Sequence, residues 1–126
     1  MFSKKIDLGL LFLRVSVSLM MLTHGYPKLV MLFSGGPIKF ADPIGIGMTA
    51  TLAIAVFSEF LCSIFLIIGL KVRIIAIFPA ITMAIAAFIV HGNDPFGKQE
   101  KAIMYLICYL VLIIAGGGKP NMDKAS

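Results

Sequence analysis

Charged residues are scarce in this chain. They make up 13% of its 126 residues, against about 25% in globular proteins, while 60% of the residues are hydrophobic. The mean hydropathy is +1.02, and the apolar residues come in long runs. This composition excludes an ordinary soluble domain and predicts an all-α integral membrane protein. At roughly 20 residues per span, there is room for a single transmembrane domain, a four-helix bundle in the lipid bilayer.

Motifs for several kinds of chemistry are also missing. No basic run with interleaved aromatics suggests nucleic-acid binding, so the net charge of +5 is attributed to membrane topology. No spacing of ligands predicts a metal site, and we expect none. Motifs for haem, flavin and iron–sulfur clusters are absent, so we expect no covalently bound cofactor. The glycine-rich stretches lack the context of a phosphate-binding loop and are read as turns.

There are two cysteines, Cys62 and Cys108, and they form no C-x-x-C pair. Helix geometry places both roughly 12 Å from the same membrane face, so a disulfide remains an open alternative. Without a nearby cation to stabilise a thiolate, small apolar packing is the favoured role.

Four spans are expected, at about 8–32, 48–70, 74–90 and 102–118. The basic start and apolar run of the first resemble a signal peptide, but Arg14 interrupts the run and no small-residue cleavage site follows, so the segment is expected to stay. The fourth has a short apolar run, 102–115. The 34–47 loop is rich in glycine and proline, and its apolar residues suggest that it lies at the membrane surface.

Basic residues predict the orientation of the four spans. The termini and the turn between the second and third spans carry Lys4, Lys5, Lys71, Arg73, Lys119 and Lys124, while the opposite side carries Lys28, Lys39, Lys98 and Lys101. Six against four favours cytoplasmic termini by the positive-inside rule.

Ionisable residues inside the spans are the candidate site. Arg14 and Lys28 share one stripe of the first helix with His24 beside it, and Glu59 lies near the middle of the second. A charge at mid-bilayer is unfavourable by about 2.5–3.5 kcal/mol, so each needs a partner or a function. Glu59 is either a functional carboxylate or the partner of Arg14 in a structural ion pair. Lys28 and His24 are either site residues or groups that snorkel to the interface.

Depth along the helices indicates which groups meet. At 1.5 Å per residue, Arg14 lies roughly 9 Å from the cytoplasmic end, Glu59 and Tyr105 roughly 16 Å, and His24 roughly 24 Å. His91 and Glu100 come level with His24. The predicted ligand-binding residues are therefore Arg14, His24, Lys28, Glu59, His91, Glu100 and Tyr105.

A series of motifs along the chain resembles the DoxX family. It comprises Leu13-Arg14, His24-Gly25 with Lys28-Leu29, Glu59, Gly69 with Arg73, His91, Glu100, and Gly116-Gly117-Gly118 with Asp123. The sequence departs from the family pattern at Ser18, Met21, Pro120 and Asn121, outside the ionisable series.

The resemblance implies a four-helix inner-membrane protein similar to subunits of quinone-linked systems, such as terminal quinol oxidase and thiosulfate:quinone oxidoreductase assemblies. We therefore expect a subunit that binds a quinone or similar lipid-soluble ligand and depends on a partner protein for electrons. The expected partner is a membrane or redox protein, or else the chain forms a homo-oligomer. The alternatives are a non-catalytic anchor or assembly subunit and, with less support, a small-solute or lipid carrier.

Overall fold

The computed structural model describes residues 4–36, 38, 40 and 42–118, which contain helices and no strands. Four helical passages follow one another. The first is α1 (Lys4–Phe33), and the second joins α2 (Met48–Val56), the π-turn η1 (Phe57–Leu61) and α3 (Cys62–Ile68). The third joins α4 (Val72–Ile75), α5 (Ile77–Ile85) and the π-turn η2 (Ala86–Val90), and the last is α6 (Phe96–Ala115). The chain is an all-α membrane bundle, as predicted.

Three passages are long and apolar enough to cross a membrane: Lys4–Phe33, Met48–Ile68 and Val72–Val90. The fourth helix, α6, has 20 residues but begins six residues before the expected span, at Phe96. Its added turns contain Lys98, Glu100 and Lys101, which explains why its composition is less apolar than that of the others.

A tight turn reverses the chain between the second and third passages. Gly69 ends α3 in the left-handed region, with φ 79°. The Leu70 N–H donates to the Phe65 carbonyl at 3.0 Å, and the Gly69 N–H donates to the Leu66 carbonyl at 3.1 Å. This pair of bonds is a Schellman motif, which satisfies carbonyls at the helix end.

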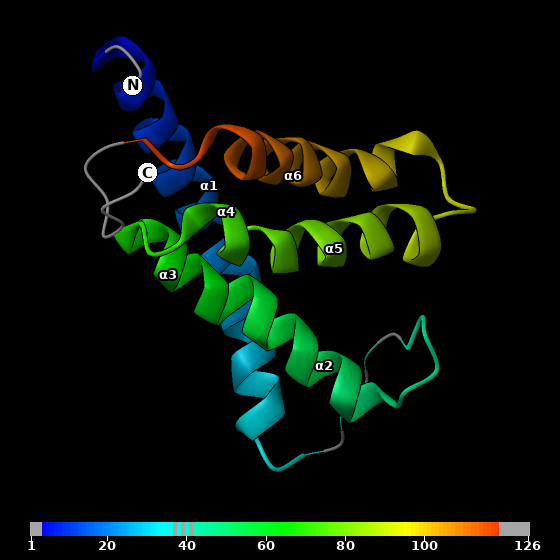
Figure 1. Cartoon of the computed structure of the whole chain (residues 1–126). Coiled ribbons are helices and arrows are strands. Elements are labelled where there is room, and N and C mark those ends of the chain that lie inside the picture. Colours follow the sequence, from blue (N-terminus) through cyan, green and yellow to red (C-terminus); the bar gives the residue numbers. More distant parts are fainter. Residues whose placement is uncertain (1–3, 37, 39, 41, 119–126) are drawn as a thin grey trace.

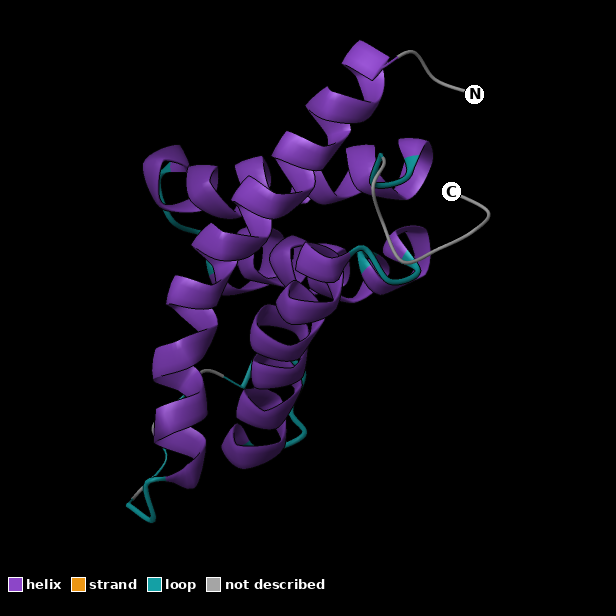
Figure 2. Cartoon of the chain, turned by 90° about the vertical axis from the view of Figure 1, so that its left-hand side faces the viewer, coloured by secondary structure: helices purple, strands orange, loops and turns teal. Residues whose placement is uncertain are grey.

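The four passages form two packed pairs (Figure 1). One pair is α1 with the helix from α2 to α3, and the other is α5 and η2 with α6. Side chains buried between the pairs include Val17, Leu66, Tyr109 and Leu112. Large exposed apolar side chains such as Phe12 and Ile114 cover the outside, as a bilayer requires. Figure 2 shows that the loops of the described chain lie at the ends of the helices.

The pairs are tied together where α6 ends. The Arg14 Nη1 donates to the Gly117 carbonyl at 3.0 Å and contacts the Gly118 carbonyl at 3.5 Å. The Arg73 Nη2 lies 3.5 Å from the Ala115 carbonyl. We call this region, residues 14, 73 and 115–118, the packed end. In Figure 1 the helices diverge from this side toward the 34–47 loop and the turn after η2, which we call the open end.

The start of α1, the α3–α4 turn and the end of α6 lie toward the same side of the molecule (Figure 1). Four antiparallel passages require this arrangement. The assignment of that side to the cytoplasm stays a prediction. Lys39, Lys119, Lys124, Pro120, Asn121 and Asp123 lie outside the described residues.

Candidate functional site

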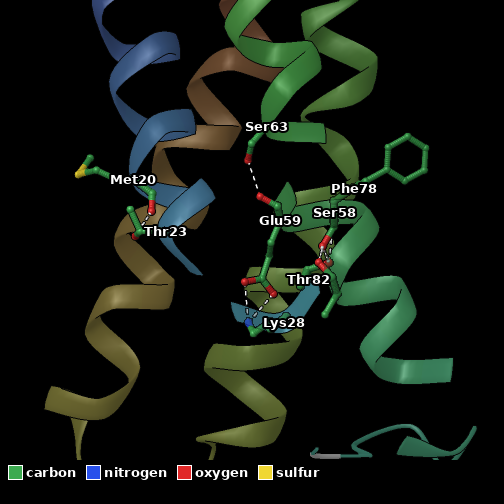
Figure 3. Close-up of polar contacts among 9 residues, drawn as sticks. Met20, Thr23, Lys28, Ser58, Glu59, Ser63, Phe78 and Thr82 are labelled. Carbon is green, nitrogen blue, oxygen red and sulfur yellow. Dashed lines mark hydrogen bonds and ion pairs between the residues drawn. The ribbon is translucent and has the colours of Figure 1, made fainter. Parts of the chain in front are cut away.

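A partly buried ion pair joins the C-terminal part of α1 to η1, on the side of the open end. The Lys28 Nζ lies 2.6 Å from Glu59 Oε1 and 2.7 Å from Oε2 (Figure 3). The Glu59 side chain is 3% exposed and that of Lys28 is 28% exposed. The predicted pairing of Glu59 with Arg14 is therefore wrong. The Arg14 guanidinium instead donates to backbone carbonyls at the packed end, and the cation paired with Glu59 is Lys28.

Gly25 makes this pairing geometrically feasible. A Cβ added there would lie 2.8 Å from the Glu59 carbonyl carbon and 2.8 Å from the Phe60 nitrogen. The backbones of α1 and η1 therefore touch at Gly25, less than one turn before Lys28. The close approach places the Lys28 ammonium directly against the Glu59 carboxylate.

The π-turn η1 carries Glu59 and is held from two sides. The Cys62 N–H donates to the Phe57 carbonyl, five residues back, which defines the wide turn. The Ser63 hydroxyl donates to the Glu59 carbonyl at 2.7 Å. On the opposite face the Thr82 hydroxyl donates to Ser58 Oγ at 2.9 Å, which ties η1 to α5 (Figure 3). Single π-turns within α-helices recur at functional sites.

A cavity of about 190 Å³ lies beside the ion pair, and we call it the polar cavity. Each helical pair contributes to its wall. The lining residues are Met21, His24, Lys28, Glu59, Met83, Ala86, His91, Lys98, Lys101, Ala102 and Tyr105. Five of the seven predicted site residues thus line one space.

Aromatic side chains order one wall of the polar cavity. The His24 ring meets Tyr105 edge-on, with ring centroids 5.8 Å apart. Tyr105 in turn stacks on Tyr109, with centroids 6.4 Å apart. The Tyr109 ring is fully buried, and its hydroxyl has no hydrogen-bond partner among the described residues. A row of contacting rings therefore runs from His24 into the core.

His91 enters the cavity with one ring nitrogen already engaged. Its backbone N–H closes η2 by donating to the Ala86 carbonyl at 3.0 Å. Its Nδ1 lies 2.8 Å from Asp94 Oδ2, and its carbonyl accepts a bond from Gln99 Nε2 at 2.9 Å. Because Asp94 fixes Nδ1, Nε2 is the nitrogen that remains for a ligand.

An apolar groove of about 260 Å³ lies next to the polar cavity. The two spaces share Lys28, Glu59, Met83, Ala86 and His91. The other walls come from the loop (Phe40, Pro43, Ile44, Ile46), from α2 (Thr51, Ile54, Ala55) and from α5 and η2 (Thr82, Ile85, Val90). The loop's apolar residues thus pack toward the helices, and the Phe40 ring lies 5.7 Å from Lys28 Nζ.

Two predicted site residues lie elsewhere. Arg14 is at the packed end. Glu100 lines a neighbouring space of about 340 Å³ between α1 and α6, with Met104 and Cys108; this space shares Lys101 and Tyr105 with the polar cavity. Neither cysteine forms a disulfide.

The prediction missed Lys98, Lys101 and Asp94. Helical spacing could have separated Lys98 and Lys101 from Glu100, because 98, 101, 102 and 105 fall on one face of α6 whereas 97, 100, 104 and 108 fall on the next. Asp94 precedes α6, so this signal does not apply to it.

Comparisons with known proteins identify the family. The DoxX family model matches residues 9–92, which is more than half of the chain. An uncharacterized protein of Haemophilus influenzae is 32% identical over 125 residues, covering 91% of this chain and 88% of that protein. No solved structure matches the chain. The matched residues include Arg14, His24, Lys28, Glu59 and His91, which carried the resemblance. The chain belongs to the DoxX family.

Proposed function

We propose that this DoxX protein binds a quinone or a similar lipid-soluble ligand as a subunit of a quinone-linked redox system. The observation that carries the proposal is that the polar cavity and the apolar groove lie side by side and share five lining residues. A quinone has a ring with two carbonyl acceptors and an apolar tail. A site for it needs donors at one end and an apolar channel at the other.

The polar cavity offers suitable donors for the ring. His24, His91 Nε2 and the Tyr105 hydroxyl are groups that donate to a carbonyl oxygen. Lys28 is already engaged by Glu59, so the pair holds the wall in place while Lys28 keeps one N–H for the ligand. The tail would follow the groove between the loop and η2.

The redox part of the proposal requires a partner. The chain contains no sequence motif for haem, flavin or an iron–sulfur cluster, so electrons would reach the quinone from a partner redox protein. The proposed setting is the inner membrane with cytoplasmic termini, and the partner is a membrane or redox protein or a second copy of the chain.

Binding of 2-methyl-1,4-naphthoquinone to the purified chain in detergent tests the proposal. We expect His24→Ala and His91→Ala each to weaken binding at least about tenfold, the effect of losing about 1.4 kcal/mol. Tyr26→Ala is the matched control, because Tyr26 is an exposed aromatic residue on α1, two positions from His24. Its affinity should equal that of the unsubstituted chain.

A specific observation supports a second candidate, a non-catalytic anchor or assembly subunit. The Lys28–Glu59 pair is complete within the chain, as a purely structural role requires. If the unsubstituted chain binds no quinone, or if both histidine variants bind it with full affinity while remaining folded, the anchor function replaces the first proposal.

A further inference from the structure

The charges around the polar cavity are unequal. Three lysines line it, Lys28, Lys98 and Lys101, against one carboxylate, Glu59. That carboxylate accepts both of its short contacts from Lys28, so it does not offset the other two lysines. No hydrogen bond or ion pair joins the side-chain ammonium of Lys98 or Lys101 to another described residue. The cavity wall therefore carries surplus positive charge.

The position of these lysines on α6 is unfavourable for the helix itself. The N-terminus of a helix carries partial positive charge and favours acidic side chains in its first turn. In α6 the first turn contains no acidic residue, and Pro95 provides no side-chain cap. Lys98 lies in this first turn and Lys101 in the next, so the helix dipole and both ammonium groups add to the same positive potential.

The remaining titratable groups do not reverse this sign. On α1, His24 experiences electrostatic effects from Lys101, Lys28 and Glu59. Asp94, which follows η2, is bound to His91 and does not line the polar cavity. Protonation of either histidine would add positive charge. Glu100 does not line the polar cavity; it lines the neighbouring space between α1 and α6, where Lys101 and Tyr105 also form part of the wall.

We infer that the site prefers a quinone that carries an acidic group, and that it binds this quinone as the anion. A quinone ring with an ionised hydroxyl group is an example. This inference rests on the proposed function and names the charge of its ligand. The apolar groove accommodates the uncharged part, and the ionised oxygen lies among Lys98, Lys101 and His24. When the acid form binds, its hydroxyl proton passes to solvent.

Two probes of similar size separate charge from ring recognition. One is 2-hydroxy-1,4-naphthoquinone, which is anionic at neutral pH, and the other is neutral 2-methyl-1,4-naphthoquinone. In titrations of the full chain in detergent at pH 7, we expect the anion to bind about tenfold more tightly. Lys101→Gln and Lys98→Gln should each reduce this preference about threefold, and added salt should reduce it further. Lys5→Gln, on α1 near the packed end, is the control and should leave it unchanged.

The colour of the hydroxy probe supplies a second readout. Bound probe should stay ionised to about one pH unit lower than free probe, the equivalent of a tenfold preference. Equal affinity for both probes, or a preference that Lys101→Gln does not alter, overturns the inference while leaving quinone binding intact. If neither probe binds, the proposed function fails as well. Decanoate is an anion with an apolar tail and no quinone ring. If it binds in place of the hydroxy probe with the same affinity, the anion preference stands but recognition of the quinone ring fails.

Discussion

The packed end and the open end use buried cations in opposite ways. At the packed end the Arg14 guanidinium is 2% exposed and donates to backbone carbonyls that follow α6. At the open end the Lys28 ammonium meets a carboxylate, and a cavity remains beside the pair. Carbonyls are fixed parts of the backbone, so Arg14 closes the bundle. A carboxylate–ammonium pair between diverging helices leaves hydrogen-bonding groups facing open space.

Breaking the ion pair at the open end should have the largest effect on stability. Lys28→Met leaves the Glu59 carboxylate buried without a cation, which should lower the free energy of unfolding by about 3–5 kcal/mol. Glu59→Gln should lower it by only about 1–2 kcal/mol, because the partly exposed Lys28 can turn toward water. The measurement is thermal or denaturant unfolding in detergent. The double variant should lose less than the sum, and additive losses would contradict the pairing.

The corresponding change at the packed end is Arg14→Met. It removes a charged donor from the Gly117 and Gly118 carbonyls and should lower the free energy of unfolding by about 1.5–3 kcal/mol. Quinone affinity, measured with the folded variant below its unfolding temperature, should stay the same because Arg14 does not line the polar cavity. A loss of affinity in this variant would show that the two ends are coupled.

Gly25→Ala tests the close contact between the helices beside the ion pair, because the added methyl group should push them apart. The new Cβ would meet the Glu59 backbone at 2.8 Å, so α1 and η1 must move apart, with a destabilisation of about 1–3 kcal/mol. Gly9→Ala, on the same helix, is the matched control because its Cβ meets nothing within 4 Å. It should leave stability unchanged or raise it by about 0.5–1 kcal/mol. The same unfolding assay compares the two, and equal responses would argue against the close contact.

The smallest effect is expected at the hydrogen bond between Ser58 and Thr82. Thr82→Val keeps the side-chain shape and removes the donor, while Ser58 can still donate to the Ala55 carbonyl. Interhelical hydrogen bonds of this kind in membranes average about 0.6 kcal/mol, and a loss of that size is expected in the unfolding assay. A loss above about 2 kcal/mol would mean that the bond also holds η1 in its wide turn.

The sequence predicted the fold more completely than the site. Long apolar runs fixed the helical class, because a membrane allows few ways to satisfy the backbone. Depth along the helices also predicted that Glu59, Tyr105 and His24 could meet. Depth did not predict Lys28 as the partner of Glu59, because the same measure places Lys28 roughly 6 Å beyond His24 and left Arg14 as the expected cation. The close contact at Gly25 brings Lys28 against Glu59, and that contact depends on packing between segments far apart in sequence.

Glu100 shows a different limit. Its depth in the membrane matched that of His24, but it lies on a different face of α6 from the residues of the polar cavity. Depth along a helix does not say which face a residue occupies. The two π-turns add a further difficulty, because each changes the direction of the side chains that follow. No propensity in the sequence of residues 57–61 or 86–90 indicated these turns.

The loop that walls the apolar groove determines how a ligand would arrive. Asp42 anchors this loop by accepting bonds from the Ile46 and Gly47 N–H groups and from the Thr51 hydroxyl. Its apolar side chains therefore form part of the wall of an apolar groove next to the polar cavity. A ligand that partitions into the bilayer would enter laterally without passing through water. Occupancy would then follow the mole fraction of ligand in the lipid, and affinities measured in detergent should be expressed on that scale.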